Sequence, residues 1–353
     1  MLKSFMTGLD DVAIGEGCRP YIIAEVAQAH DGSLGLAHAY IEAAASAGAN
    51  AIKFQTHYAS EESTSKEPWR VRFSYQDDSR YDYWERMEFT DSQWKGLKEH
   101  ADRLGIAFLS TPFSTKAVNL LESIDVPMWK IGSGEINNTP LLKEISATGK
   151  PVILSSGMSS LSEIDAAVEL LEESNTPYAV LQCTSSYPCP PDLIGLNNIS
   201  FFKDRYNCPV GLSDHSGSPI AAIAAMALQA SIIEVHIVFD KSMFGPDVKS
   251  SLTIDELSQV VKASRDIHTM LSSPVDKDSL AEGSMAPLRA LFNKSIVLSS
   301  DLPSGTVLTE QHFSFKKPGA GMPPGEVNQL IGKVLLKDLP KDHFIEMSDV
   351  ENG

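Results

Sequence analysis

The sequence predicts an α/β protein: a TIM (β/α)8 barrel followed by a small, mostly β module. Eight short apolar segments of strand type occur within residues 1–270, and most are followed by a helical stretch. The segments are apolar almost throughout, as parallel strands are when both faces of their sheet are covered. Eight βα units in roughly 250 residues are typical of this barrel. The pattern then changes near residue 270, where the second module is expected to begin.

The elements follow one another in a regular order. Strands are expected at residues 21–27, 51–56, 106–111, 126–132, 151–157, 178–184, 208–214 and 231–238. Helices are expected at residues 34–49, 91–105, 114–124, 139–149, 161–174 and 218–230. A long polar insertion follows the second strand, and a proline-rich loop follows the sixth. A doubly wound open sheet is the structural alternative, but no GxGxxG follows the first strand, which argues against a dinucleotide-binding version of it.

The chain is expected to divide into a barrel and a smaller C-terminal domain. The barrel spans residues 1–270, and residues 271–289 form a linker with a short helix. Residues 290–353 hold short strand-like segments and turn signals, such as LPSG at 302–305, which indicate a small β module.

Composition excludes several classes of function. The 353 residues carry a formal net charge of −17, which argues against nucleic acids and anionic membranes as partners. The four cysteines form no CxxC pair, so neither a disulfide framework nor a structural zinc site is expected. The N-terminal residues lack the apolar run of a signal peptide, and no segment has the roughly 18 apolar residues of a membrane span. We therefore expect a cytoplasmic protein.

Two histidines lie at the ends of consecutive strands. His215 follows the seventh strand and His236 lies near the end of the eighth, with an apolar helix between them. A strand–helix–strand unit forms a parallel pair, so both imidazoles project from the same end of the sheet. There they can bind one metal ion, or each can cap its own strand. Imidazole ligands favour Mn²⁺, with Mg²⁺ or Co²⁺ as alternatives, and two ligands leave positions open for water or a substrate oxygen.

Charged and hydroxyl side chains gather at the same strand ends. Chemistry in a TIM barrel lies at the C-terminal ends of the strands, and buried strands carry charges only when these are paired or used. The candidates are Glu25, Lys53, Gln55, Thr111, Phe113, Lys130, Ser133, Glu135, Ser155, Ser185, Tyr187, Ser213 and Asp247. Taken singly, most of them fit a capping or turn position. Together they suit a phosphate and a carboxylate beside a polyhydroxylated partner.

The motifs that carry these residues resemble those of the sialic acid synthase (NeuB) family. They are IIAEVAQAHDGSLGLA, AIKFQT, STPF, WKIGSGEINNTPLL, PVILSSGM, LQCTSSYPCPP, VGLSDHSG and EVHIVFDKSMFGPD, in this order along the chain. PGAGMPP and LIGKVL extend the resemblance into the C-terminal module. The resemblance therefore covers nearly the whole chain.

The resemblance implies a TIM barrel joined to an antifreeze-like (SAF) domain. It implies a domain-swapped homodimer, in which the SAF domain of one chain helps to close the active site of the other. The implied enzyme is a transferase that condenses phosphoenolpyruvate with N-acetylmannosamine, or a related N-acyl hexosamine, and water. The products are N-acetylneuraminate, or a related nonulosonic acid, and phosphate, released by C–O cleavage. Legionaminic and pseudaminic acid synthases share this scaffold.

Carried over motif by motif, the resemblance implies a role for each candidate residue. The metal ligands would be His215 and His236. The phosphoenolpyruvate carboxylate would face Lys53 and Thr111, and its phosphate region would face Gln55, Lys130, Ser133, Ser155, Ser185 and Ser213. The sugar would contact Glu25, Phe113, Tyr187, Asp247 and Lys317. The catalytic candidates are Glu25, Asp247 and Glu135, the last for proton transfer or for orienting the attacking water.

Four positions depart from the family pattern. Ala29 precedes His30 where asparagine is common, Ser185 stands where many members have asparagine, and Val235 stands where a basic residue is common. Lys317 replaces an arginine that touches the sugar's acyl group across the dimer, and lysine cannot reproduce the forked contact of arginine. These changes leave the reaction class intact and leave the identity of the sugar open.

Two other functions fit the sequence less well. Synthesis of a 3-deoxy-aldulosonate phosphate would need a second phosphate site with arginines at strand ends, where this chain has lysines only. A non-catalytic carbohydrate-binding protein would be expected to lack some of the charged strand-end groups, yet all of them are present.

Overall fold

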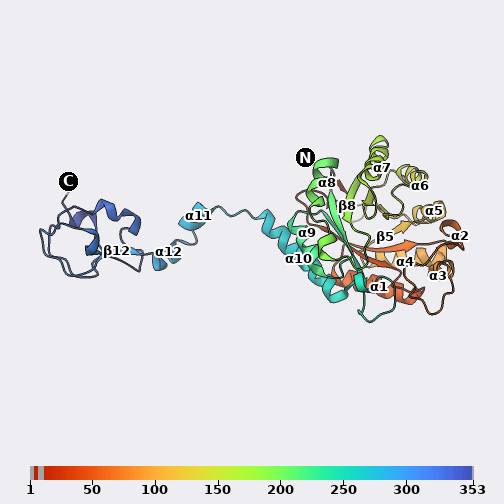
Figure 1. Cartoon of the computed structure of the whole chain (residues 1–353), viewed down its shortest axis with the longest axis horizontal. Helices are drawn as coiled ribbons and strands as arrows, with labels where there is room; N and C mark the ends of the chain where they lie inside the picture. Colours follow the sequence, from red (N-terminus) through yellow and green to blue (C-terminus); the bar gives the residue numbers. More distant parts are fainter. Residues whose placement is uncertain (1–3, 7–11, 352–353) are drawn as a thin grey trace. The chain divides into compact units, whose positions relative to one another are not determined.

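The computed structural model describes residues 4–6 and 12–351. The chain divides into two compact units, Met1–Ser272 and Ser273–Gly353, and the division falls within the predicted linker. Figure 1 shows strands surrounded by helices in the first unit, and shorter elements in the second. Among the described residues, no helix combines the length and the apolar character that crossing a bilayer requires.

Eight parallel strands form a nearly closed barrel in the first unit. They are β3 (Tyr21–Ala27), β4 (Ala51–Thr56), β5 (Ala107–Pro112), β6 (Trp129–Ile131), β7 (Val152–Ser155), β8 (Tyr178–Cys183), β9 (Val210–Asp214) and β10 (Ile232–Val238). Hydrogen bonds connect them in the order β5-β4-β3-β10-β9-β8-β7-β6. The first and eighth barrel strands pair in parallel, with His236 opposite Glu25. The predicted TIM barrel is confirmed.

Helices follow most strands, and the first six of those named here lie where the sequence predicts a helix, whereas the last, at the end of the barrel, was not predicted. They are α1 (Leu34–Ala47), α4 (Asp91–Arg103), α5 (Thr115–Ser123), α6 (Thr139–Ser146), α7 (Leu161–Glu173), α9 (Pro219–Ala227) and α10 (Ile254–Ser272). A serine, threonine or asparagine side chain caps the N-terminus of each of the first six by accepting a backbone N–H. Such caps contribute about 1 kcal/mol each, so local sequence alone marks where these helices begin.

Some helices lie where the sequence pattern predicts none. The insertion after β4 contains α2 (Ala59–Glu62) and α3 (Arg80–Met87). The proline-rich loop leads through a 3-10 turn, η1 (Pro191–Leu193), to α8 (Asn198–Tyr206). After β10 come η2 (Val248–Ser250) and β11 (Leu252–Thr253), which pairs with β10. α8 buries Ile199, Phe202 and Tyr206, a helical spacing that the polar residues between them obscure.

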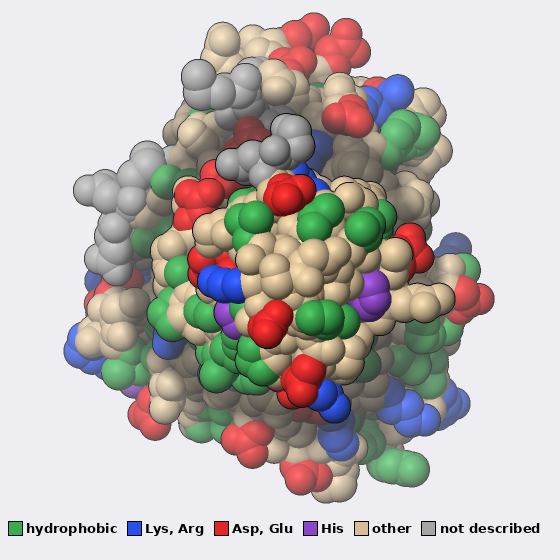
Figure 2. Space-filling view, turned by 90° about the vertical axis from the view of Figure 1, so that its left-hand side faces the viewer, with side chains coloured by type: hydrophobic (Ala, Val, Ile, Leu, Met, Phe, Trp, Pro, Cys, Tyr) green, Lys and Arg blue, Asp and Glu red, His purple; other side chains and the backbone are tan. Residues whose placement is uncertain are grey.

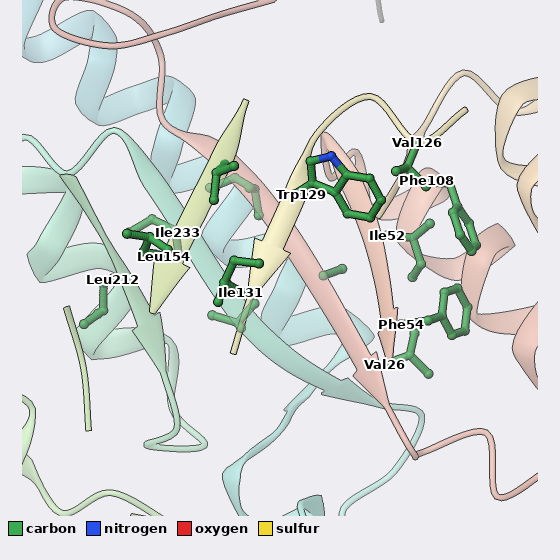
Figure 3. Packing of buried hydrophobic residues seen from close by; sticks show 14 of the residues in the cluster. Val26, Ile52, Phe54, Phe108, Val126, Trp129, Ile131, Leu154, Leu212 and Ile233 are labelled. Atoms are coloured by element: carbon green, nitrogen blue, oxygen red, sulfur yellow. The ribbon is translucent and has the colours of Figure 1, made fainter. Parts of the chain in front are cut away.

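The larger core lies between the outer faces of the strands and the surrounding helices. Alternate strand residues, such as Trp129 and Ile131 of β6 or Ile52 and Phe54 of β4, belong to this core (Figure 3). All four are fully buried. Because side chains alternate along a strand, the residues between them point into the barrel.

A second apolar core fills the N-terminal end of the barrel interior. It includes Leu109, Met128 and Leu181. The antiparallel pair of β1 (Phe5–Met6) and β2 (Ala13–Ile14) packs one apolar side chain from each strand against it. This end of the barrel is therefore closed, and a site inside the barrel must open at the opposite end.

The second unit has its own small core. Two helices, α11 (Lys277–Glu282) and α12 (Ala286–Phe292), precede the antiparallel pair β12 (Ser295–Leu298) and β13 (Phe313–Lys316). Single bridges join the other segments, between which lie η3 (Glu310–His312), η4 (Pro324–Gln329) and η5 (Met347–Asp349). Figure 2 shows one face of this unit, where hydrophobic, acidic and basic side chains are interspersed. The predicted small β domain is confirmed.

Candidate active site

The barrel interior becomes polar toward the C-terminal ends of the strands. Beyond the apolar core of the interior, each strand has at least one buried polar or charged side chain. One from each strand forms the following set: Glu25 on β3, Lys53 on β4, Thr111 on β5, Lys130 on β6, Ser155 on β7, Cys183 on β8, Ser213 on β9 and Glu234 on β10. We call this set the buried polar layer. Charges at such depth are stable only when they are paired.

Lys53 is paired with two carboxylates. Its ammonium contacts Glu25 and lies 3.7 Å from Glu234 Oε2 and 3.3 Å from Thr111 Oγ1. Burial lowers the pKa of Lys53 to about 7, and the charge of Glu234 opposes this effect only in part. At neutral pH this lysine is therefore balanced between its charged and neutral forms, and a bound anion would favour the charged form.

Lys130 and Glu234 form a further ion pair within the buried polar layer. The Lys130 ammonium lies 3.4 Å from Glu234 Oε1 and donates to Ser155 Oγ at 2.7 Å, while Ser213 donates to Glu234 Oε1 at 2.9 Å. Burial by itself raises the pKa of Glu234, but the charges of Lys130 and Lys53 outweigh burial and lower the pKa to about 2. Glu234 is thus an ionised carboxylate that both lysines share.

Small residues bring the loops after β6, β7 and β8 close together. Ser133 Oγ lies 3.1 Å from Ser185 Oγ, within hydrogen-bonding distance. A Cβ atom at Gly157 would overlap the side chain of Ser133 and lie 2.6 Å from Ser185 Oγ. The glycine therefore permits this close approach. The hydroxyl groups of Ser133 and Ser185 thus lie together in the cavity lining, where they can donate to a bound anion.

His215 and His236 lie next to each other beyond the buried polar layer, and both are buried. Their ring centroids are 5.1 Å apart. The Tyr187 ring stacks on His215 with 4.1 Å between centroids and meets His236 edge-on at 5.9 Å. Burial lowers the pKa of both histidines to about 3, so both imidazoles are neutral at physiological pH.

The hydrogen bonding of the two imidazoles fits a metal site. His215 Nδ1 lies 3.0 Å from the backbone oxygen of Thr184, which can only accept, so Nδ1 carries the proton and Nε2 keeps its lone pair. Metal-binding histidines commonly use a backbone carbonyl in this way. The part of the chain that the structure describes has no cluster of three or more histidine, cysteine or acidic side chains that could hold a metal ion. A metal held by this pair would therefore need water or substrate as further ligands.

A cavity of about 670 Å³ opens at this end of the barrel. Its lining includes Gln55, Phe113, Ser133, Glu135, Ser185, Tyr187, His236 and Asp247, all of which are predicted site residues. The insertion after β4 supplies a further wall, which includes Glu62, Trp69, Arg70, Arg80 and Trp84. The volume lies within the range of sites for small organic ligands.

Asp247 is held by an arginine of the insertion. Arg70 Nη2 donates to Asp247 Oδ1 at 2.8 Å, and the guanidinium carbon lies 4.4 Å from the centre of the Tyr187 ring. Because Tyr187 also stacks on His215, Arg70 connects the insertion to the histidine pair.

Glu135 lines the cavity from the loop after β6. Asn138 Nδ2 donates to Glu135 Oε2 at 2.7 Å. Burial raises the pKa of Glu135 more than this hydrogen bond lowers it. The carboxyl group is thereby moved toward the range in which it can accept or donate a proton near neutral pH.

Most of the predicted site residues lie either in the buried polar layer or around the cavity. Glu25, Lys53, Thr111, Lys130, Ser155 and Ser213 belong to the layer, and His215 joins the cavity wall through Tyr187. Lys317 lies in the second unit, where its ammonium is 4.8 Å from the centre of the Phe292 ring. The individual roles of these residues stay predictions.

Sequence reasoning did not single out Glu234, Arg70, His57 or Gln28, which belong to the same region. Glu234 precedes His236 by two positions on one strand, so the alternation of side chains places both on one face and could have revealed it. Gln28 and His57 directly follow β3 and β4, so their places at strand ends could have revealed them. Arg70 reaches the cavity from the insertion after β4, and no local pattern predicts its position.

Comparisons with known proteins agree with this architecture. The NeuB family model matches residues 40–276, and the SAF domain model matches residues 293–351. The N,N'-diacetyllegionaminic acid synthase of Campylobacter jejuni is 34% identical over 92% of this chain and 98% of its own length. The N-acetylneuraminate-9-phosphate synthase of Homo sapiens is 33% identical over 94% of this chain and 93% of its own length.

A solved structure shows the same likeness. The crystal structure of the N-acetylneuraminic acid synthetase from Leptospira borgpetersenii, in complex with citrate, superposes with a TM-score of 0.72 at 32% identity. The match covers 82% of this chain and 98% of that chain. The chain therefore belongs to the NeuB family, the phosphoenolpyruvate-dependent synthases of nonulosonic acids, and carries a SAF domain at its C-terminal end.

Proposed function

We propose that this protein condenses phosphoenolpyruvate and water with N-acetylmannosamine, or a closely related N-acyl hexosamine, to give N-acetylneuraminate or a related nonulosonic acid and phosphate. The observation that carries the proposal is the pair of buried lysines beneath the cavity. Lys53 and Lys130 have only 3% and 2% of their surface exposed. Two ammonium groups held at this depth beside serine hydroxyls suit an anionic substrate such as phosphoenolpyruvate.

The alternatives are the hexosamine precursors of legionaminic and pseudaminic acids. Synthases of N,N'-diacetyllegionaminic acid and of N-acetylneuraminate 9-phosphate are similar to this chain at nearly the same identity. Sequence likeness therefore does not separate these products, and the sugar has to be decided by assay.

The buried polar layer would bind phosphoenolpyruvate. Lys53 and Thr111 would take its carboxylate, and Lys130 would take its phosphate region together with Gln55, Ser133, Ser155, Ser185 and Ser213. Glu234, which is ionised between the two lysines, holds both ammonium groups in place. Holding two reactants in an aligned geometry contributes roughly 7–11 kcal/mol at best.

His215 and His236 would bind a divalent cation, Mn²⁺ in the first place, with Mg²⁺ or Co²⁺ as alternatives. When bound, the cation supplies Lewis-acid polarisation of the sugar's carbonyl group. Its neutral imidazole ligands have their lone pairs available because burial disfavours protonation.

The residues around the cavity would orient the sugar and the attacking water. Asp247, held by Arg70, would contact the sugar together with Glu25, Phe113 and Tyr187, so that its aldehyde carbon faces C3 of phosphoenolpyruvate. The electron pair of the phosphoenolpyruvate double bond forms the bond between these carbons, and the aldehyde oxygen takes up a proton to become a hydroxyl group. Water then adds at the electron-poor C2, and Glu135 would orient this water or take its proton. Cleavage of the bond between C2 and the phosphate oxygen then releases phosphate and leaves the 2-keto acid.

We also propose that two copies of the chain form a homodimer, in which the SAF domain of one copy helps to close the active site of the other. The support is the family resemblance and the match of the SAF domain model to residues 293–351. In this arrangement Lys317 would contact the sugar from the second copy.

The function is tested by phosphate release from phosphoenolpyruvate in the presence of Mn²⁺, over a panel of N-acyl hexosamines. We expect release that depends on one or a few of these sugars, and the mass of the product identifies the sugar that was used. The proposal would be wrong if no sugar of the panel caused phosphate release.

The metal site is tested by removing each ligand. We expect His215→Ala and His236→Ala each to abolish metal-dependent turnover and to lower the bound metal measured by mass spectrometry, with the thermal unfolding midpoint little changed. His38→Ala, a histidine on α1 outside the cavity, is the matched control and should keep wild-type activity. Near-normal activity in either ligand variant would show that the two-histidine site is wrong.

A further inference from the structure

A chain of hydrogen bonds runs through the cavity wall from Glu25 to Glu62. Gln55 Nε2 donates to Glu25 Oε1 at 3.4 Å, and Gln28 Nε2 donates to Gln55 Oε1 at 2.5 Å. Gln28 Nε2 also lies 2.7 Å from His57 Nε2, and His57 Nδ1 lies 2.6 Å from Glu62 Oε1. All of these side chains except that of Glu25 line the cavity.

The hydrogen bond at the Glu25 end determines which group donates and which accepts at each step of this hydrogen-bond chain. Glu25 Oε1 is the acceptor at this end, because Gln55 Nε2 donates to it. Gln55 must therefore turn its NH₂ group toward Glu25 and its oxygen toward Gln28. Gln28 in turn presents its NH₂ group to both Gln55 and His57 Nε2, at distances that require an acceptor in each place.

This direction leaves one tautomer for a neutral His57 ring. Nε2 must keep its lone pair to accept from Gln28, so the proton lies on Nδ1, where Glu62 accepts it. The ring is held between Trp84 and Phe113, with centroid distances of 4.2 and 4.6 Å and interplanar angles of 19° and 9°. The stack keeps the imidazole in the plane that its two hydrogen bonds require.

The other tautomer fits the geometry less well. A proton on His57 Nε2 could be donated to Gln55 Oε1 at 3.2 Å. It would then face the nearer NH₂ group of Gln28, and Glu62 Oε1 would lose its donor. The imidazolium form has the same conflict at Nε2.

Both N–H bonds of the Gln28 amide are thus used inside the wall. No hydrogen bond between described residues reaches Gln28 Oε1, although Gln28 lines the cavity. The carbonyl oxygen of Gln28 is therefore available to a ligand in the cavity, and it can only accept a hydrogen bond. Hydroxyl and amide N–H groups of a sugar are the donors that match it.

The arrangement includes an energetically unfavourable feature that a histidine with a purely structural role would not require. Glu62 Oε2 is buried and finds no hydrogen-bond donor among the described residues. Unsatisfied buried polar atoms are uncommon in folded proteins, and those that persist often belong to functional sites. The position of Glu62 in the cavity wall is consistent with such a role.

We infer that His57 is a positioning residue for the sugar substrate. The inference rests on the proposed function. Glu62 holds His57 in its Nδ1–H form, His57 orients the Gln28 amide, and the Gln28 carbonyl oxygen accepts a hydrogen bond from a hydroxyl or amide N–H group of the N-acyl hexosamine. Gln55 also bonds to Glu25, and no hydrogen bond between described residues joins His57 to Lys53 or Lys130, so removal of His57 should affect binding of phosphoenolpyruvate far less than binding of the sugar.

Steady-state kinetics of two variants test this inference. His57→Phe keeps the stack with Trp84 and Phe113 but removes both nitrogens, and it should raise the KM for the sugar about tenfold, the effect of one lost hydrogen bond. The KM for phosphoenolpyruvate should change by less than roughly twofold. Gln28→Leu should raise the sugar KM by a similar factor. The control is His38→Phe, which should leave both values unchanged.

The double variant His57→Phe/Gln28→Leu separates positioning from independent contacts. If His57 acts through Gln28, the double variant has about the same sugar KM as either single variant, because both changes remove one interaction. The inference would be overturned if the double variant raised the sugar KM by the product of the two single factors. It would also be overturned if His57→Phe left the sugar KM unchanged. If the wild-type protein turns over no sugar, the proposed function fails as well. If the wild-type protein turns over a sugar and the variants keep the wild-type KM for that sugar, only the inference is overturned and the proposed function stands.

Histidine-selective ¹⁵N NMR of the full chain reads the tautomer without any substrate. The spectrum of the wild-type protein should contain one neutral Nδ1–H imidazole that is absent from His57→Phe. If the absent signal belongs to an Nε2–H imidazole or to an imidazolium, the direction of the hydrogen-bond chain is wrong and the inference falls.

Discussion

The buried polar layer contains equal numbers of positively and negatively charged side chains. Lys53 and Lys130 supply two ammonium groups, and Glu25 and Glu234 supply two carboxylates, all with almost no exposed surface. An anionic substrate therefore enters a layer whose charges are already paired. Its binding must shift a carboxylate away from a lysine or bring in a proton.

Lys53 is the group expected to take up that proton. Burial lowers its pKa to about 7, so a large fraction of it is neutral at pH 8 in the free protein. Phosphoenolpyruvate beside it would raise the pKa again, because an adjacent anion favours the charged form. We predict that binding at pH 8 takes up a substantial part of one proton, and that affinity falls as the pH rises above 7. Titration calorimetry in two buffers of different ionisation enthalpy measures the uptake.

Lys53→Arg is the matched variant for this prediction. The guanidinium stays charged at every accessible pH, so the proton uptake that Lys53 causes should disappear. Equal uptake in Lys53→Arg and the wild-type protein would assign the proton to another group.

At the scale of elements, the insertion after β4 adds a wall to a site whose other residues lie mainly at the ends of strands. Arg86 on α3 donates to Asp31 Oδ1 at 2.7 Å and to Asp77 Oδ2 at 2.8 Å, which attaches α3 to the loop between β3 and α1. Gly32 in that loop has a φ of 76°, and a Cβ there would overlap the backbone oxygen of Arg86. These contacts hold the wall that carries Arg70 in place.

We predict that Arg86→Met lowers the free energy of unfolding by about 2 kcal/mol at pH 7, because it removes charge-assisted hydrogen bonds. The hydrogen bond from Arg86 lowers the pKa of Asp77. This stabilisation is present above the unfolded pKa of about 3.9 and is lost as the pH falls through the lower folded value. The difference between variant and wild type should therefore shrink in acid, as measured by denaturant unfolding at pH 7 and pH 3.

The exposed pair of Arg205 and Asp165 provides the control. Arg205→Met breaks an ion pair of 2.6 Å on the surface, where solvent screens the charges, and should change stability less than Arg86→Met does. Equal or larger destabilisation by Arg205→Met would contradict the role given to Arg86.

At the scale of the whole molecule, the two units have separate apolar cores. The cores of the barrel lie within residues 1–272, and the core of the second unit includes Ile296, Leu308 and Ile345. Cutting the chain after Ser272 therefore removes no side chain from the core of either unit.

We predict that residues 1–272 fold alone and bind phosphoenolpyruvate, because the buried polar layer is intact in them. If the SAF domain closes the active site of a second copy, this fragment should lose synthase activity and the dimeric state of the full chain. Calorimetry, phosphate release and light scattering measure the three properties. A fragment with full activity would show that the SAF domain plays no part in closing the site.

The fold could be predicted from the sequence because its signals are local. Apolar runs such as 21–27 and 51–56 mark strands covered on both faces, and capping residues such as Ser33 and Ser160 mark where helices begin. One of the exceptions also has a local cause. α8 lies behind a proline-rich loop, and polar residues obscure its apolar spacing.

The sequence by itself determined the barrel and the strand ends at which Lys53, Lys130, His215 and His236 come together, because the C-terminal ends of parallel strands meet at one end of a barrel. Only the tertiary structure decided how these groups are paired. The contact of Lys53 with Glu25 depends on strand register, and its contact with Glu234 crosses the barrel interior. The place of Arg70 and the pairing of Gln28 with His57 depend on packing between segments far apart in the chain, which no local pattern encodes.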